Sequence, residues 1–271
     1  MERIGLSSYG FELNEENFIK LAKSGIAAIE LSKKYNEYDG VDYAELKKLS
    51  DRYGVGLWSF HLPFSLLDDV SALDKEIYKK TIERHKGLIE KGSDIGFSRF
   101  VLHPSAEPIK PEDREEKIAL SMQAMDSLAE HAAKCGAVIA LEDLPRTCLG
   151  NTTDEMLRLL GANDKLRVCF DTNHLLQGSP TDFIERLGDK IVTLHVSDYD
   201  FLDEKHWLPG EGQVNWGELI EALRAVNYSG LWMYEVGLKC PNTLSRRDLC
   251  FDDYRENHAA LFAGVTPPRI D

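Results

Sequence analysis

The sequence predicts a single (β/α)₈ barrel, and three observations support this prediction. The chain has 271 residues, a length that suits one such barrel, since barrels of this class commonly need about 250 residues. Short apolar runs alternate eight times with longer amphipathic stretches, without a change in composition that would mark a second domain. Carboxylate and imidazole side chains repeatedly close the apolar runs. We therefore expect residues 1–271 to form one α/β domain.

The predicted strands are apolar at consecutive positions, which is typical of parallel strands buried on both faces. They cover residues 3–8, 26–31, 55–60, 98–103, 137–142, 166–170, 191–196 and 230–235. Helices are expected near residues 14–24, 41–53, 74–92, 113–135, 152–160, 180–188, 215–226 and 246–262. Capping residues mark several helix starts, among them Asn14, Thr152 or Thr153, and Ser179. Glycines mark several helix ends, at Gly25, Gly54, Gly96 and Gly136.

Composition excludes several classes of function. The formal net charge is 32 − 46 = −14, which offers no basic surface for a phosphate backbone, so no nucleic-acid partner is expected. No Gly-x-Gly-x-x-Gly motif follows the first strand, and a dinucleotide-binding fold is therefore not supported. The first residues lack the apolar stretch of a signal peptide, and no apolar run approaches the roughly 18 residues of a membrane span.

Cysteine usage is typical of a reducing compartment. The five cysteines are odd in number and none forms a Cys-x-x-Cys pair. Free thiols in the cytoplasm are the expectation that follows.

Seven strand ends carry residues of the types that bind metals or protons. Because parallel strands of one barrel end at the same mouth, we expect these side chains to converge there. They are Glu30, His61, His103, Glu142, Asp171, His195 and Glu235.

Four of these residues, Glu142, Asp171, His195 and Glu235, come from the last four predicted strands, which are neighbours around a barrel. Three carboxylates in one partly dry pocket would repel one another, and a divalent cation removes that repulsion. Three hard oxygen ligands and one imidazole favour Mn²⁺, with Mg²⁺, Co²⁺ or Zn²⁺ as alternatives. Ordinary ion pairs or helix caps are the competing interpretation of each residue taken singly.

Other polar and aromatic residues are candidates for substrate contacts. His61, His103, His174, His206 and Trp207 are predicted to hold a substrate. His61, His103, His174 and His206, together with Glu204, are also candidate ligands of further metal ions. Segment 197–214, which contains Glu204, His206 and Trp207, is longer than most strand-to-helix loops and is therefore expected to be functional.

Five more residues complete this set of predictions. Glu30 is expected to orient His61 or His103, and Trp58 and Phe60 to pack against an apolar face of the substrate. Arg146 and Lys239, just beyond the fifth and eighth predicted strands, are candidate contacts for an anionic group, with surface positions as the alternative.

These residues give the chain a resemblance to the sugar phosphate isomerase/epimerase superfamily, whose members have a xylose isomerase-like TIM barrel. The resemblance extends over essentially the whole chain. It rests on residues 141–143, 170–174, 194–198, 206–212 and 234–235. The motifs are specific for the superfamily and do not specify one reaction.

Three branches of the superfamily imply different chemistry. The ketose 3-epimerase branch implies one Mn²⁺ or Co²⁺ held by Glu142, Asp171, His195 and Glu235, with both glutamates exchanging protons; Phe201 stands where that branch has an arginine. The inosose dehydratase branch implies the same ligands in a lyase. The endonuclease IV branch implies three zinc ions. Its ligands would be His61, His103, Glu142, Asp171, His174, His195, Glu204 (in place of an aspartate), His206 and Glu235.

The expected function is therefore a metal-dependent isomerase or epimerase of a keto-sugar or a polyol-derived ketone, acting through an enediolate. Glu142 and Glu235 are the predicted acid and base. A dehydratase of a keto-sugar or inosose is the alternative, and a three-zinc DNA repair enzyme is a further one. A metal-binding barrel that has lost activity also fits the pattern. The sequence leaves the oligomeric state open.

Overall fold

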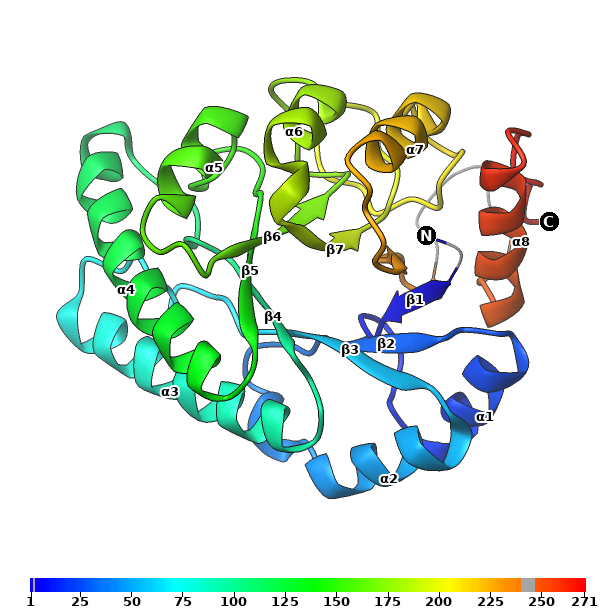
Figure 1. Ribbon diagram of the computed structural model, residues 1–271, viewed down its shortest axis with the longest axis horizontal. Coiled ribbons are helices and arrows are strands. Elements are labelled where there is room, and N and C mark those ends of the chain that lie inside the picture. The colour runs from blue at the N-terminus through cyan, green and yellow to red at the C-terminus, as the bar shows by residue number, and fades with distance from the viewer. Residues whose placement is uncertain (2, 240–246) are drawn as a thin grey trace.

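The computed structural model describes residues 1, 3–239 and 247–271, and it forms a single (β/α)₈ barrel. The ribbon shows the helices as an outer ring around the strands (Figure 1). The strands are β1 (Ile4–Ser7), β2 (Ala28–Leu31), β3 (Gly56–His61), β4 (Arg99–Leu102), β5 (Val138–Glu142), β6 (Arg167–Asp171), β7 (Ile191–His195) and β8 (Trp232–Tyr234).

The main helices follow the strands in alternation. They are α1 (Glu15–Lys23), α2 (Tyr43–Tyr53), α3 (Lys75–Asp94), α4 (Arg114–Lys134), α5 (Thr153–Leu160), α6 (Pro180–Leu187), α7 (Trp216–Ala225) and α8 (Phe251–Phe262). Short 3₁₀ turns lie at Tyr38–Gly40, Pro111–Asp113 and Gly188–Lys190. Among the described helices, none is long and apolar enough to cross a membrane.

Neighbouring strands are parallel, in the order β7-β6-β5-β4-β3-β2-β1-β8. The barrel closes between β7 and β8 just beyond the end of β7. There the Val196 amide donates to the carbonyl of Met233 at 2.8 Å, and the Glu235 amide donates to the carbonyl of Val196 at 3.1 Å. The predicted fold is therefore confirmed, and all the strands end at one mouth.

The predicted helix signals act as expected. Asn14, Thr152 and Ser179 accept hydrogen bonds from backbone amides of the first turns of α1, α5 and α6. The four predicted glycines adopt left-handed φ angles between 68° and 109°. Some predicted strands and helices begin earlier in the sequence than the observed ones. Ile26, predicted to open a strand, instead donates its amide to Leu21 at the end of α1. The predicted last helix begins at Phe251, and residues 240–246 lie outside the described part of the chain.

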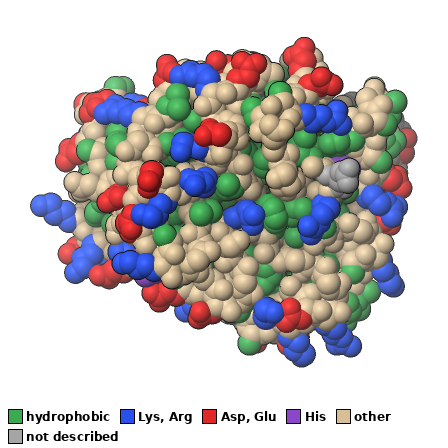
Figure 2. All heavy atoms as spheres, viewed as in Figure 1, with side chains coloured by type: hydrophobic (Ala, Val, Ile, Leu, Met, Phe, Trp, Pro, Cys, Tyr) green, Lys and Arg blue, Asp and Glu red, His purple; other side chains and the backbone are tan. Residues whose placement is uncertain are grey.

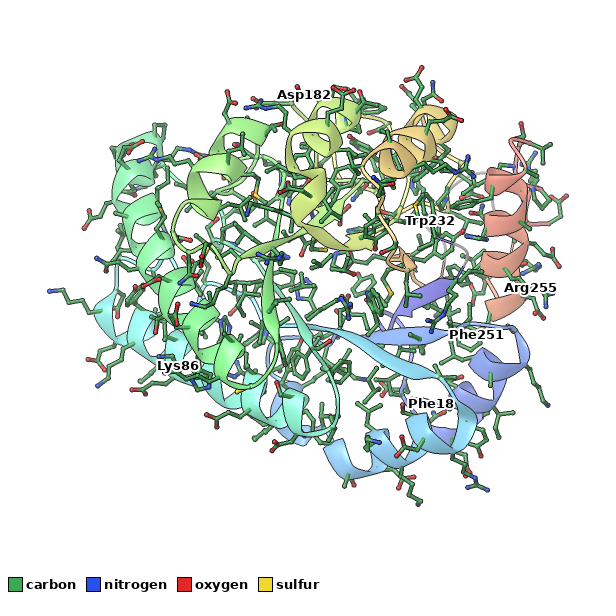
Figure 3. The ribbon with its side chains drawn as sticks, in the orientation of Figure 1. Phe18, Lys86, Asp182, Trp232, Phe251 and Arg255 are labelled. Carbon is green, nitrogen blue, oxygen red and sulfur yellow. The ribbon has the colours of Figure 1, made fainter. Side chains whose placement is uncertain are left out.

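Apolar side chains fill both layers of the fold. Phe18 of α1 and Trp232 of β8 are fully buried between strands and helices, whereas Asp182 and Arg255 are exposed on the outer helices (Figure 3). Lys, Arg, Asp and Glu are interspersed on the face seen in Figure 2.

The interior of the barrel is closed at its amino-terminal end. The Arg99 guanidinium lies 3.6 Å from the centre of the Trp58 ring, and the Trp58 indole donates to the Thr193 hydroxyl at 3.1 Å. Gly5 leaves room for Met233, because a Cβ there would lie 2.5 Å from the Met233 Cε. Any substrate cavity must therefore open at the carboxyl ends of the strands.

Trp58 and Phe60 do not reach that mouth, and the prediction that they pack against a substrate is wrong. Trp58 belongs to the interior plug just described. The Phe60 ring is fully buried and packs against Phe97 and Phe100, at 5.5 and 5.4 Å between ring centres, on the helix side of the strands.

One buried carboxylate organises the long loop between β7 and α7. Asp198 accepts hydrogen bonds from the amides of Tyr199, Gly210 and Val214 and from the Trp216 indole, at 2.8–3.1 Å. Its backbone also pairs with that of Trp207. Gly212 is required beside it, because a Cβ there would lie 2.3 Å from the Asp198 Oδ1. Asp198 thus holds in place the loop that carries Glu204 and His206.

We expect Asp198→Asn to lower the free energy of unfolding by about 1–3 kcal/mol, because buried donors lose an acceptor. Proteolysis should become faster within residues 197–214. Denaturant unfolding and limited proteolysis measure both effects, with the exposed Asp189→Asn as the control. Stability and cleavage equal to those of the control would show that Asp198 does not organise the loop.

Candidate metal centre

The predicted ligands gather at the barrel mouth. A cavity of about 1240 Å³ opens there, and its lining includes His61, His103, Glu142, His174, Glu204, His206 and Glu235. Asp171, His195 and Glu30 are fully buried and do not belong to the lining. The cavity floor therefore consists of titratable side chains from most of the strands.

The four residues predicted as ligands of one metal lie together. One ligand-type atom from each of Glu142, Asp171, His195 and Glu235 falls within 4.8 Å of the others. The His195 Nδ1 is the common neighbour, at 2.9 Å from Glu142, 3.3 Å from Glu235 and 3.8 Å from Asp171. This arrangement is compact enough for one cation to contact all four side chains after small adjustments, since such bonds are about 2.0–2.6 Å long.

Two adjacent groups of the same kind extend the site. The first consists of His61, His103 and Glu142, with both imidazole Nε2 atoms 3.1–3.2 Å from one oxygen of Glu142. The second consists of His174, Glu204 and His206, with the Glu204 Oε1 at 3.6 and 3.0 Å from the two Nε2 atoms. Glu142 belongs to both the four-residue group and the first of these. The nine residues therefore form one continuous set of ligand-type side chains.

Backbone carbonyls select the tautomers of three histidines. The Nδ1 atoms of His61, His174 and His206 lie 2.9, 2.8 and 3.2 Å from the carbonyl oxygens of Leu62, Asp143 and Glu235. A carbonyl only accepts, so each Nδ1 carries the proton when the ring is neutral. Each Nε2 then presents a lone pair toward a carboxylate cluster, the tautomer that a metal ligand needs.

Glu30 has the corresponding role for His195. The Glu30 Oε2 lies 3.0 Å from the His195 Nε2 and accepts from the Ser59 hydroxyl at 2.7 Å. With its proton on Nε2, His195 turns Nδ1 toward the four-residue group. A carboxylate that fixes the far side of a ligating imidazole is a common feature of metal sites. The prediction that Glu30 orients His61 or His103 is therefore wrong, because the Glu30 carboxylate contacts the ring of His195 instead.

Burial disfavours the charged forms of the carboxylates and imidazoles in this site, whereas the attraction between them favours those forms. Burial raises the pKa of Asp171 to about 7, although His174 acts in the opposite direction. Burial would lower the pKa of His174, but Asp171 and Glu204 outweigh it and raise the pKa well above the usual value. Burial would also lower the pKa of His61, but the Glu142 carboxylate outweighs burial and raises that pKa. Protons therefore partly neutralise this cluster when no cation does.

The residues present fit a divalent cation. Within the described part of the chain, the buried Asp171 Oδ2 accepts no hydrogen bond, although it lies within the four-residue group and 3.5 Å from the His174 Nδ1. An unpartnered buried carboxylate oxygen is costly unless a charge compensates it. Oxygen and imidazole donors suit Mn²⁺, Mg²⁺, Co²⁺ or Zn²⁺. Cation binding would displace the protons described above, so its affinity is expected to fall as the pH falls.

Arg146 lies on the surface at the mouth, as the alternative interpretation expected, and its guanidinium is engaged by neighbouring carboxylates. Its guanidinium pairs with Glu107, with Asp203 at 2.8 Å and with Glu204 at 2.9 Å. Its backbone has a left-handed φ of 53°. Because these partners lie on different loops, Arg146 connects the loop after β5 to the loops after β4 and β7, and it fixes Glu204 beside His174 and His206.

Some contributions could not be foreseen from the pattern of strand ends. Asp143 accepts the Asp171 amide at 2.8 Å and so fixes the end of β6 against that of β5; only its position next to Glu142 marks it in the sequence. Tyr9 and Phe64 line the cavity on the loops after β1 and β3. Trp207, predicted to contact the substrate, is not in the lining, and its backbone pairs with Asp198 instead.

Removal of a ligand should abolish metal retention. We expect purified Asp171→Asn and His195→Ala to lose the bound divalent cation, because each loses a donor of the four-residue group. Metal analysis measures this. The control is His131→Ala, which removes an imidazole from α4, outside the site. A full metal complement in both site variants would contradict the assignment.

Comparison with known proteins agrees with this architecture. Residues 18–249 match the family model described as a xylose isomerase-like TIM barrel. An uncharacterised protein, MJ1311, of Methanocaldococcus jannaschii is 30% identical over 195 residues, which is 69% of this chain and 66% of that protein. A probable endonuclease 4 of Thermoplasma acidophilum is 27% identical over 199 residues, or 67% of each chain.

Sugar-converting enzymes are also similar. A D-psicose 3-epimerase of Agrobacterium fabrum is 26% identical over 242 residues, covering 83% of this chain and 80% of the enzyme. The crystal structure of a D-tagatose 3-epimerase-like protein superposes with a TM-score of 0.76 at 26% identity, over 87% of this chain and 90% of that one. The match to the family model includes most of the chain and all the strands from β2 to β8. The chain belongs to the xylose isomerase-like TIM-barrel family.

Proposed function

We propose that this protein is a metal-dependent isomerase or epimerase of a keto-sugar or a polyol-derived ketone. The observation that carries the proposal is the pair Glu142 and Glu235, which share one ligand group at the floor of an open cavity. Similarity to proteins named D-psicose 3-epimerase and inosose isomerase supports a sugar substrate. Mn²⁺ is the cation that three oxygens and one imidazole favour most in this proposal.

The two glutamates approach the cavity from different parts of the barrel. Glu142 ends β5 and Glu235 follows β8, and β6 and β7 separate these strands in the sheet. Two carboxylates so placed can contact a substrate carbon from different sides. One removes the α-proton, and the other returns a proton to the opposite face or to the adjacent carbon. Return to the same carbon is epimerisation, and return to the adjacent carbon is isomerisation.

A divalent cation held by Glu142, Asp171, His195 and Glu235 would supply Lewis-acid polarisation of the substrate carbonyl. The chain's own residues do the remaining work. His61, His103, His174 and His206 line the cavity and can hold substrate hydroxyls. Buried Asp171 and His195, with Glu30 behind the latter, keep the glutamates in position. A β-hydroxyl leaving from the same deprotonated substrate would make the enzyme a lyase instead, so this alternative shares every residue of the site.

The charges around the mouth favour a neutral polyol over a phosphorylated compound. Lys33, Lys34 and Arg146 are the cations in the cavity lining, against the carboxylates of Glu12, Glu37, Glu107, Glu142, Glu204 and Glu235. Lys33 pairs with Glu12 at 2.9 Å, and Arg146 is engaged as described above. The raised pKa values of His61, His174 and His206 and a bound cation would offset part of this negative charge, but a phosphate dianion at the mouth would still face more carboxylates than lysines and arginines. The substrate that we propose therefore carries no phosphate at the mouth.

One observation favours a second function, that of a three-metal DNA repair hydrolase. The nine ligand-type residues expected for that chemistry are all present and fall into three adjacent groups. The acidic lining of the mouth opposes it, because duplex binding depends on phosphate contacts from Lys and Arg. We therefore favour the sugar isomerase or epimerase over the DNA repair hydrolase, and a separate experiment distinguishes them.

If the glutamates are the acid and base, Glu142→Gln and Glu235→Gln should each reduce turnover by about 10²–10⁴-fold, the usual effect of a positioned proton-transfer group. The assay is deuterium incorporation from solvent at the α-carbon across a panel of ketoses, keto-sugars and inososes. Glu37→Gln, an exposed carboxylate in the same lining, is the control. Metal content is measured for each variant, and near-normal turnover in a metal-loaded Gln variant would remove that glutamate from the mechanism.

Duplex DNA containing an abasic site separates the two candidate functions. We expect no tight, salt-sensitive binding and no incision at ordinary enzyme concentrations, because the mouth is acidic. Gel-shift and nicking assays with Zn²⁺-loaded and Mn²⁺-loaded protein measure this. Efficient incision that is lost in His174→Ala would overturn the sugar proposal and establish the hydrolase.

A further inference from the structure

The cavity is larger than a free monosaccharide requires. Its volume is about 1240 Å³, whereas pockets for drug-sized ligands usually enclose about 300–1,000 Å³. The ligand groups occupy only the floor. The rest of the lining comes from the loops that follow β1 to β5, and its large exposed apolar side chains, Tyr9, Tyr35, Phe64 and Leu66, all lie on the loops after β1, β2 and β3. We call these four residues the outer rim.

The outer rim is apolar and exposed. The exposed fractions are 55% for Tyr9, 40% for Tyr35, 48% for Phe64 and 64% for Leu66. Exposed apolar side chains that gather around a cavity usually mark a binding surface. These side chains are therefore available to a ligand without any rearrangement of the core.

Two rings of the outer rim contact opposite ends of the ligand set. Phe64 stacks on His103 at 3.8 Å between ring centres and lies 5.3 Å from His61. Tyr9 lies 6.2 Å from the His206 ring. A group bound between Phe64 and Tyr9 would therefore be continuous with a sugar held by the histidines of the floor.

We propose that the outer rim is a second subsite, which binds a ring attached through a glycosidic bond to the keto-sugar at the floor. This inference rests on the proposed function and specifies its substrate class. Aromatic rings pack well against the apolar face of a sugar or against an aromatic aglycone.

The subsite has a chemical consequence for the reacting sugar. When the reacting sugar is the glycosyl unit, the glycosidic bond occupies its anomeric carbon, so that carbon no longer provides a free carbonyl. The ketone must then be at another carbon of the sugar ring, and the α-proton exchanged by Glu142 and Glu235 is on a neighbouring ring carbon. The reaction that supplies such a substrate is the oxidation of a ring hydroxyl of a glycoside.

The experiment compares one hexose, oxidised to a ketone at a ring carbon, as the free sugar and as its phenyl β-glycoside. We expect kcat/KM for α-proton exchange to be about tenfold or more higher for the glycoside, a preference worth about 1.4 kcal/mol. Phe64→Ala and Tyr9→Ala should reduce this preference. Leu202→Ala, which removes an exposed side chain outside the lining, is the matched control and should keep it.

Calorimetric titration of the same two sugars provides a readout that does not depend on turnover. Tighter binding of the glycoside, reduced in Phe64→Ala, supports the subsite even if neither sugar undergoes exchange; that result would overturn the proposed function alone. Equal binding and equal turnover of the two sugars would overturn the subsite alone. A change of molecular mass in solution in the Phe64 and Tyr9 variants, with unchanged preference, would also overturn it and assign the outer rim to a second copy of the chain.

Discussion

Repulsion among buried carboxylates at one barrel mouth is the constraint on which this site depends. Glu142, Asp171 and Glu235 share a group with His195, and among the residues that the structure describes none donates a hydrogen bond to the Asp171 Oδ2. Without a cation, histidines with raised pKa values partly compensate these charges, as the shift at His174 shows. With a cation, the same side chains become ligands. The burial of the carboxylates and the chemistry of the donor atoms therefore both favour metal binding.

Residues that never contact a substrate keep this arrangement in place. Glu30 fixes the ring of His195 from behind, and backbone carbonyls select the tautomers of the histidines around it. Asp198 organises the loop after β7, and Arg146 connects that loop to its neighbours. The site is therefore built from rigid strand ends and from loops held by charge-assisted hydrogen bonds, which are stronger than neutral ones. Such support gives the precise placement that proton transfer requires.

The sequence predicted the barrel because strand and helix periods alternate clearly, and it predicted that the ligand-type side chains gather at one mouth because parallel strands end on one side. Its errors are local. Trp58 and Phe60 precede His61 in one apolar run, and the sequence pattern could not show that one enters the barrel plug and the other the helix layer. The partners of Arg146 are distant in the chain, so its ion pairs could not be foreseen. The same holds for the outer rim, because loop conformation decides which exposed side chains gather around a cavity.

Anomalous diffraction at the absorption edge of the co-purified metal tests the central claim most directly. The account predicts a strong peak among Glu142, Asp171, His195 and Glu235, with the carboxylate oxygens and the His195 Nδ1 at about 2.0–2.6 Å from it. Peaks within the groups of His61 and His103 or of His174 and His206 would add ions to the same site. Crystals of metal-replete protein without any peak in the four-residue group would contradict the account.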